Sequence, residues 1–140
     1  MTGAYILVLR LDKSSKIKIG KLGKIRFEKG YYAYAGSAMG RGEALKNRIR
    51  RHQKLAKEKK GKLFWHIDYF LANPDVKITK VLIFKSDKKI ECQISQRISK
   101  LAKKTIKAFG SSDCRCQGHF HYLGNRCGLK FANTEGIAVY

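Results

Sequence analysis

Two apolar runs near the N-terminus constrain the fold of this chain most strongly, because both are rich in residues that favour β-strands. Residues 4–11 are Ala-Tyr-Ile-Leu-Val-Leu-Arg-Leu, and residues 31–36 are Tyr-Tyr-Ala-Tyr-Ala-Gly. Valine, isoleucine and tyrosine pack well on a pleated surface, and a nearly continuous apolar run indicates a strand covered on both faces. We therefore predict two central strands, with Tyr32 and Tyr34 on the same face of the second.

The remaining patterns predict an α/β fold. Further strands are expected at residues 17–19, 25–27, 80–85 and 137–140, and helices at residues 43–57, 64–71 and 91–108. In the last helix the inward positions are Ile94, Ile98, Leu101 and Ala102. Three core strands interleaved with three helices predict a small, mainly antiparallel three-stranded central sheet flanked by helices. The 140 residues fit a single domain, 1–140, with a core at about 1–109 and a Cys/His-containing C-terminal extension at about 110–140.

The charge balance points to a polyanionic partner. The chain has 31 Lys and Arg residues against 10 Asp and Glu residues, which gives a formal charge of +21. Such an excess favours nucleic acid over an anionic membrane surface, because no apolar run approaches the length of a membrane span. The first residues, Met-Thr-Gly-Ala-Tyr, do not form a signal peptide. We expect a cytoplasmic protein whose four cysteines are reduced thiols or metal ligands.

The helix expected at residues 43–57 is the densest basic segment. Nine of the seventeen residues from Lys46 to Lys62 are lysine or arginine, a density that suits contact with a phosphate backbone. The residues predicted to bind nucleic acid are Lys46, Arg50, Arg51, Lys54 and Lys57. Trp65 follows directly and could stack on an unpaired base, although its pattern favours packing in the core.

Two side chains of this helix could take part in phosphodiester chemistry. Arg48 and His52 are four residues apart and therefore lie on one helix face. A guanidinium group can bind phosphate through two N–H groups, and an imidazole can pass a proton or orient water. Alone, such a pair is more often a solvated helix face, and Tyr5 and Tyr34 could equally be core tyrosines. Together, the four side chains suit phosphodiester cleavage.

Three ordered motifs resemble those of the GIY-YIG nuclease superfamily. They are Gly-Ala-Tyr at residues 3–5, Tyr-Ala-Gly at residues 34–36 and Leu-x-x-Arg-Ile-x-x-His at residues 45–52. Alanine replaces the middle isoleucine of both tripeptides, at a position expected to face the core. Further segments are similar to an archaeal branch of unknown function that is sometimes joined to endonuclease III: residues 40–52, 65–69, 91–92 and 112–116.

The resemblance implies the GIY-YIG fold and a divalent-metal-dependent endonuclease acting on nucleic acid, with DNA the expected substrate and repair or recombination the expected setting. It implies catalytic roles for Tyr5, Tyr34, Arg48, His52 and Glu91. One tyrosine would act as general base, and which of the two is left open. Glu91 would hold one Mg²⁺ or Mn²⁺ ion. From the residues alone, Glu91 is only the first residue of a helix, where its negative charge stabilises the helix dipole by about 0.3–1 kcal/mol.

The segment from residue 111 carries metal-ligand residue types. Cys114, Cys116 and His119 could bind zinc, although their Cys-x-Cys-x-x-His spacing does not match the common paired layouts. The favoured alternatives are small buried cysteines, or a His119 at the rim of the active site.

Two functions are rivals to the endonuclease: a non-catalytic, basic nucleic-acid-binding module of the same fold, and a zinc-stabilised adaptor for a DNA-repair enzyme.

Overall fold

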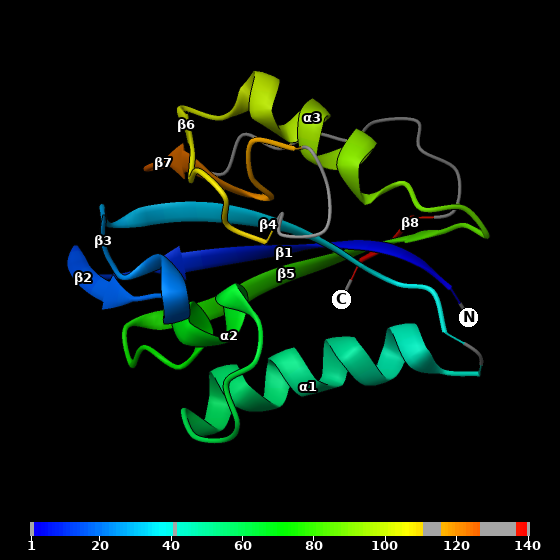
Figure 1. The fold of residues 1–140 in the computed structure, drawn as a ribbon, viewed down its shortest axis with the longest axis horizontal. Coiled ribbons are helices and arrows are strands. Elements are labelled where there is room, and N and C mark those ends of the chain that lie inside the picture. The colour runs from blue at the N-terminus through cyan, green and yellow to red at the C-terminus, as the bar shows by residue number, and fades with distance from the viewer. Residues whose placement is uncertain (1, 41, 111–115, 127–136, 140) are drawn as a thin grey trace.

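An antiparallel sheet forms the centre of the computed structural model, which describes residues 2–40, 42–110, 116–126 and 137–139 (Figure 1). Among these residues the sheet has six strands in the order β6-β7-β4-β1-β5-β8, and every neighbouring pair is antiparallel. The strands are β1 (Gly3–Leu11), β4 (Gly30–Ala38), β5 (Val76–Lys85), β6 (Lys104–Thr105), β7 (Phe120–Gly124) and β8 (Ile137–Val139).

Strand β1 lies in the middle of the sheet because its side chains are apolar on both faces. Tyr5, Leu7 and Leu9 belong to one buried cluster, whereas Ile6 and Val8 belong to another. This alternation follows the two-residue period of a strand. Both faces of β1 are therefore covered, as expected from its continuous apolar run.

The helices cover the two faces of the sheet (Figure 1). Helices α1 (Ala44–Glu58) and α2 (His66–Leu71) lie on one face, and α3 (Glu91–Leu101) lies on the other. Helix α1 is amphipathic, and it buries Leu45, Ile49, His52 and Leu55 at the spacing of a helical stripe. None of the helices in the described ranges combines the length and the apolar character that a membrane crossing requires.

A small separate hairpin follows β1. Strands β2 (Ser15–Lys18) and β3 (Lys24–Phe27) pair with each other, and a 3₁₀ turn, η1 (Gly20–Leu22), connects them. The two short strands expected here are thus present, and they form a two-stranded sheet of their own. Phe27 anchors the hairpin, because its ring packs edge-to-face on Phe70 of α2 at 5.1 Å.

The expected α/β architecture and the mainly antiparallel sheet are confirmed, but the expected sheet of three strands is too small. The three central strands are present as β4, β1 and β5, and β6, β7 and β8 widen the sheet. Strand β5 begins at Val76, four residues before the expected start. Residues 120–124 and 137–139, in the expected C-terminal extension, supply β7 and β8 to the same sheet.

The helix expected at residues 91–108 is too long. It ends at Leu101, and the next residue, Ala102, has an extended backbone with ψ of 153°. The chain then pairs with β7, where the amides of Lys103 and Ile106 donate to the carbonyls of Tyr122 and Phe120. Ile94 and Ile98 are buried as expected, whereas Leu101 is 57% exposed, which corrects its expected inward position.

Candidate active site

A cleft of about 360 Å³ lies beside the central strands and helix α1. All five residues for which the resemblance implies catalysis line it: Tyr5, Tyr34, Arg48, His52 and Glu91. They come from β1, β4, α1 and α3, so segments far apart in the sequence meet at this one place.

The pairing of β1 with β4 brings the two tyrosines together. In this register Tyr5 lies opposite Gly36, and Tyr34 lies opposite Leu7. Both tyrosines point to the face covered by α1, and their ring centroids are 6.4 Å apart. The odd positions of β1 and the even positions of β4 share this face, so the strand period itself sets the distance between the two phenols.

The glycine that ends the second motif makes room for Tyr5. A Cβ atom added at Gly36 would lie 2.5 Å from the Tyr5 hydroxyl oxygen and 2.5 Å from Cζ. At Gly3 an added Cβ would overlap the carbonyl oxygen of Phe84 on β5, and φ at Gly3 is +154°. Both motif positions therefore require glycine, because another part of the chain lies too close for a Cβ atom. At Gly36 this is the Tyr5 side chain, and at Gly3 it is the backbone of Phe84.

The substitution Gly36→Ala is expected to displace the Tyr5 ring. Because the ring is buried among packed side chains, the added methyl group should cost about 1–3 kcal/mol of folding free energy. Urea unfolding of the variant beside the wild type measures this cost. An unchanged unfolding midpoint would contradict the account of why glycine stands at this position.

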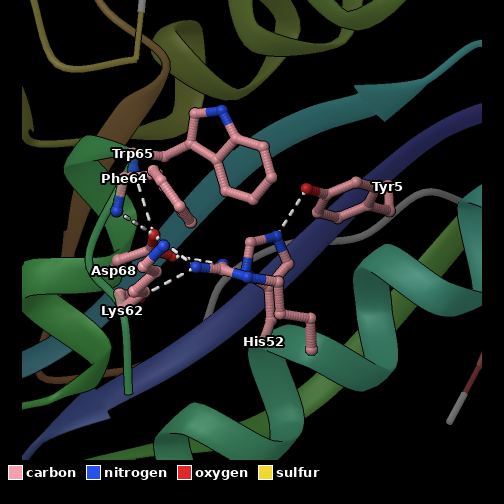
Figure 2. A network of polar contacts seen from close by, with 7 residues as sticks. Tyr5, His52, Lys62, Phe64, Trp65 and Asp68 are labelled. Carbon is pink, nitrogen blue, oxygen red and sulfur yellow. Dashed lines mark hydrogen bonds and ion pairs between the residues drawn. The ribbon is translucent and has the colours of Figure 1, made fainter. Parts of the chain in front are cut away.

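The hydroxyl of Tyr5 is hydrogen-bonded to Nε2 of His52 at 2.7 Å, and both side chains are buried. Figure 2 shows the Tyr5 hydroxyl pointing at the imidazole ring that α1 presents. Burial lowers the pKa of His52 to about 4, against a partial opposing effect of Asp68. Burial, together with Tyr34, raises the pKa of Tyr5 well above its ordinary value. At neutral pH the pair therefore consists of a neutral phenol and a neutral imidazole.

Arg48 is fixed at the mouth of the cleft by two neighbours. Its Nη1 donates a hydrogen bond to the carbonyl of Ser37 at 2.6 Å, just beyond Tyr34 on β4. Its guanidinium carbon lies 4.7 Å from the ring centroid of Trp65. One N–H edge is thus held by the sheet and one face by an aromatic ring, which orients a positive charge that lines the cleft.

Trp65 does not pack in the core, and that favoured expectation is wrong. Its side chain is 39% exposed, and the neighbouring Phe64 is 65% exposed. The indole lies at the cleft, with the guanidinium carbons of Arg48 and Arg51 both 4.7 Å from its ring centroid. The cation–π contacts with these two arginines offset the free-energy cost of leaving the Trp65 ring partly exposed. The apolar run around Trp65 resembled a core pattern, which is why the sequence favoured burial.

Arg51 is held by a buried carboxylate that was not predicted from the sequence. Its Nη1 and Nη2 donate to the two carboxylate oxygens of Asp68 at 2.8 and 2.9 Å. Asp68 is fully buried and also accepts the backbone amides of Phe64 and Trp65. Burial acts to raise the pKa of Asp68, but the bonds from Arg51 and these amides outweigh it and lower the pKa. An acidic residue in the first turn of α2, in a chain poor in acids, was the available signal.

The other predicted phosphate-binding residues lie on the outer surface of α1. Arg50, Lys54 and Lys57 are exposed, and Lys46 is half-buried. None of these four side chains lines the cleft. Arg51 differs from them in its contact with the Trp65 ring. The structure therefore divides the predicted set into one arginine bound to Asp68 and four residues along the helix surface.

Glu91 is the first residue of α3, and its side chain is 16% exposed where it lines the cleft. Its Oε2 lies 3.8 Å from Nδ1 of His119, a buried histidine on the other side of the carboxylate. His119 is not among the residues that line the cleft, and it lies next to the cleft residue Glu91.

Two of the three residues proposed for zinc lie together. Cys116 and His119 form a group with Cys92 in which the three ligand atoms are all within 4.8 Å of one another. Cys114, the other predicted ligand, lies outside the described residues. Cys92 was not among the predicted ligands, and the signal that could have found it is its position directly after Glu91.

Two buried histidines, His52 and His121, are expected to make folding depend on pH. Burial lowers the pKa of each to about 4, from an ordinary value of 6.5. The folded chain therefore keeps both neutral, while the unfolded chain takes up protons as the pH falls below about 6.5. The free energy of unfolding should decrease from about pH 6.5 down to about pH 4, by at most about 3 kcal/mol per histidine. Urea unfolding between neutral pH and about pH 5 measures the slope.

His121→Gln separates the two contributions. The imidazole of His121 is hydrogen-bonded at 2.8 Å to Ser95 and at 2.8 Å to Thr105, away from the cleft. Removing it should reduce the pH slope, since one histidine whose pKa is strongly lowered by burial is then lost. A slope equal to that of the wild type would show that His121 binds protons equally in the folded and unfolded chains.

Comparison with known proteins gives one family match. A family described as a domain of unknown function, DUF123, matches residues 4–137, which include Tyr5, Tyr34, α1, α3 and β7. No curated protein and no solved structure matches the chain significantly.

Proposed function

We propose that this chain, which belongs to the family of domains of unknown function DUF123, is a GIY-YIG-like, divalent-metal-dependent endonuclease that cleaves phosphodiester bonds in nucleic acid. The observation that carries the proposal is the single cleft that contains two tyrosines, an arginine, a neutral histidine and a carboxylate. DNA is the proposed substrate, and repair or recombination the proposed setting. The cytoplasmic location expected from the sequence is part of the same proposal.

In this proposal Arg48 binds the scissile phosphate. The guanidinium lines the cleft, and its bond to Ser37 and its contact with Trp65 fix its orientation before substrate arrives. Charge grows on the non-bridging phosphate oxygens as water attacks phosphorus. A cation held in advance at that position stabilises the transition state without reorganising.

Tyr5 and His52 form the proposed proton relay. Burial keeps the Tyr5 phenol protonated, so it can accept a proton from the attacking water only while it passes its own proton on. Nε2 of the neutral His52 lies 2.7 Å from the Tyr5 oxygen and can receive that proton. The hydroxide formed adds to phosphorus, the ester P–O bond breaks, and the leaving oxygen takes a proton from water. The imidazolium then returns its proton to solvent.

The hydrogen bond to His52 makes Tyr5 the proposed general base. The hydroxyl of Tyr5 has a proton acceptor at hydrogen-bond distance. The Tyr34 ring meets His52 edge-on, with centroids 6.3 Å apart, and packs on Phe109 at a centroid distance of 6.3 Å. Tyr34 is therefore proposed to shape the cleft and to orient water or phosphate.

Glu91 is the proposed ligand of one Mg²⁺ or Mn²⁺ ion. Its donor set, a single cleft-lining carboxylate, fits an ion that keeps much of its hydration shell and also binds substrate phosphate. When bound, such an ion stabilises negative charge on the phosphate oxygens. The part of Glu91 is to hold its carboxylate at the edge of the cleft, where α3 begins.

The exposed basic residues of α1 are proposed to supply most of the affinity. Arg50, Lys54 and Lys57 can follow a phosphate backbone, with affinity that falls steeply as salt is added. At the cleft, the exposed indole of Trp65 offers a stacking surface for an unpaired base, an interaction worth about 1–3 kcal/mol. The alternative function, a non-catalytic binding module, would use the same surface without needing the cleft.

Tyr5→Phe tests the proposed chemistry. Loss of the hydroxyl breaks the relay, so single-turnover cleavage of a labelled DNA in Mg²⁺ or Mn²⁺ should slow by about 10²-fold. Binding should change little, because the phenol is buried. The variant also leaves Nε2 of His52 without its partner, which should cost about 1–3 kcal/mol of stability.

Tyr32→Phe is the matched control. Tyr32 lies on the same strand as Tyr34, and its hydroxyl donates to the carbonyl of Glu28, outside the cleft. This variant should lose some stability but keep its cleavage rate. Equal rates in Tyr5→Phe and the wild type would remove Tyr5 from the mechanism.

A further inference from the structure

A second candidate metal site lies next to Glu91 and is formed by side chains that the proposed nuclease chemistry does not use. The sulfur atoms of Cys92 and Cys116 and a ring nitrogen of His119 lie within 4.8 Å of one another. Both cysteines are half-buried, and His119 is buried. Two thiols and an imidazole are borderline-soft donors, a set typical of zinc and unsuited to Mg²⁺.

One distance within the group equals that expected for two ligands of a tetrahedral ion. Zn–S bonds of about 2.3 Å and Zn–N bonds of about 2.0–2.1 Å place the sulfur and nitrogen ligands of one zinc about 3.6 Å apart. Sγ of Cys92 lies 3.6 Å from Nε2 of His119. The same separation also allows a weak S–H···N hydrogen bond, which is the competing explanation that an experiment must exclude.

The backbone on both sides of the group is fixed by the core. The amide of His119 donates to the carbonyl of Phe109 at 2.7 Å, and its carbonyl accepts the amide of Ala35 on β4 at 3.0 Å. The carbonyl of Gly118 accepts the hydroxyl of Ser95 on α3 at 3.1 Å. The segment before β7 is thereby attached to both β4 and α3. Ligands from two chain segments therefore meet without any rearrangement of the fold.

The second nitrogen of His119 provides an independent observation. Nε2 faces Cys92, and Nδ1 lies 3.8 Å from Oε2 of Glu91. Histidine ligands of metals commonly direct their other ring N–H at a carboxylate, which fixes the tautomer and the ring orientation. The carboxylate of Glu91 lies on that side of the ring, at an ion-pair distance that is longer than a hydrogen bond.

We propose that Cys92, Cys116 and His119 bind one zinc ion, and that the zinc-bound His119 orients Glu91 through its Nδ1–H group. A carboxylate has two oxygens, so Oε2 can face His119 while Oε1 faces the cleft. The zinc site stands on its own contacts, whereas the effect on Glu91 rests on the proposed function. The zinc ion then has a structural role, and it affects the nuclease cleft through the side chain of Glu91 alone.

The binding test uses the full chain, freed of metal under reducing conditions, and titrated with Co²⁺ and then Zn²⁺. One Co²⁺ per chain should bind with the thiolate-to-metal absorption and the strong visible bands of a tetrahedral site, and one Zn²⁺ should displace it. Cys92→Ser, Cys116→Ser and His119→Gln should each lose this signal. His121→Gln is the matched control, because His121 lies on the same segment and is bonded to Ser95 and Thr105, and it should keep the signal.

The contact between His119 and Glu91 is tested separately, by measuring the affinity of the chain for zinc. Glu91→Ala should weaken zinc binding by about 10–100-fold, the usual effect of losing a partner behind a metal ligand. Asp87→Ala, an exposed acid four residues earlier, should not change it. In the cleavage assay, loss of zinc should raise the Mg²⁺ concentration that gives half-maximal rate by about tenfold.

Three outcomes would overturn the proposal: a wild-type chain that binds no Co²⁺, binding without thiolate absorption, or binding retained in both cysteine variants. Circular dichroism of each variant shows whether it is folded, and the wild-type stoichiometry decides the question even where a variant does not fold. Because zinc binding is measured without nucleic acid, a failure of the nuclease proposal leaves it unaffected. Cleavage by a chain that binds no zinc would overturn this inference alone.

Discussion

Arg48→Ala is expected to slow cleavage by about 10³-fold or more while nucleic-acid binding weakens by no more than a few-fold. Removing one preorganised cation from a transferring phosphoryl group typically costs this much, since its charge acts on the transition state. Binding persists because the exposed basic residues of α1 remain. The comparison requires single-turnover rates, and dissociation constants at a fixed salt concentration.

Arg50→Ala provides the control for Arg48→Ala. Arg50 lies two residues further along α1, on the exposed surface of the helix and outside the cleft. Its substitution by alanine therefore removes the same charge without changing the cleft. It should reduce affinity and the salt dependence of binding, and leave the single-turnover rate unchanged. The reverse pattern, with Arg50 needed for rate and Arg48 only for affinity, would contradict the assignment of the cleft.

Glu91→Ala is expected to abolish metal-dependent cleavage, with a loss of about 10³-fold or more in rate. The physical reason is that Glu91 is the carboxylate that lines the cleft beside Arg48 and Tyr5. Folding should change by about 1 kcal/mol at most, from loss of a favourable charge at the N-terminus of α3. The measurement is the rate as a function of Mg²⁺ or Mn²⁺ concentration.

Asp87→Ala is the matched acidic control for that experiment, since it removes a nearby exposed carboxylate outside the cleft. It should keep both the rate and the metal dependence. Glu91→Gln separates charge from size, and it should behave like Glu91→Ala if metal binding is the role of this residue. Cleavage at the wild-type rate by Glu91→Gln would show that no metal is held there.

Much of the central architecture followed from the sequence because its strands are strongly patterned. Tyr5, Leu7 and Leu9 alternate with Ile6 and Val8, and the two sets fill the two clusters on opposite faces of the sheet. Short strands are harder to predict. The pairing of β6 with β7 depends on backbone bonds at Lys103 and Ile106 to a distant segment, and a local pattern cannot contain that information.

The candidate site was predictable in a different way. Periodicity places Arg48 and His52 on one face of a helix, but nothing local to Glu91 places it beside Tyr5. Four strands and two α-helices separate the two residues in the chain order. The motif resemblance supplied that grouping, and the structure brings the same five side chains into one cleft. Asp68 and Cys92 were missed because each acts through a partner distant in sequence, Arg51 and His119 respectively.

Trp65 illustrates the limit of apolar patterning. Leu63, Phe64 and Trp65 form an apolar run, yet all three side chains are exposed. The cations of Arg48 and Arg51 hold the indole at the surface, and a sequence scale that treats aromatic residues as core residues does not represent this. Exposed aromatic residues beside a basic cleft are instead a feature of nucleic-acid-binding surfaces.

The most direct test of the proposed activity is cleavage of a labelled panel of duplex, flap, branched and single-stranded DNA and RNA. Each substrate is incubated with Mg²⁺, Mn²⁺ or EDTA, with the wild type beside Arg48→Ala and Glu91→Ala. We expect cleavage by the wild type that requires the metal and is lost in both variants, and the panel then identifies the preferred substrate. Tight, salt-sensitive binding with no cleavage of any substrate would contradict the nuclease proposal and establish the non-catalytic binding module.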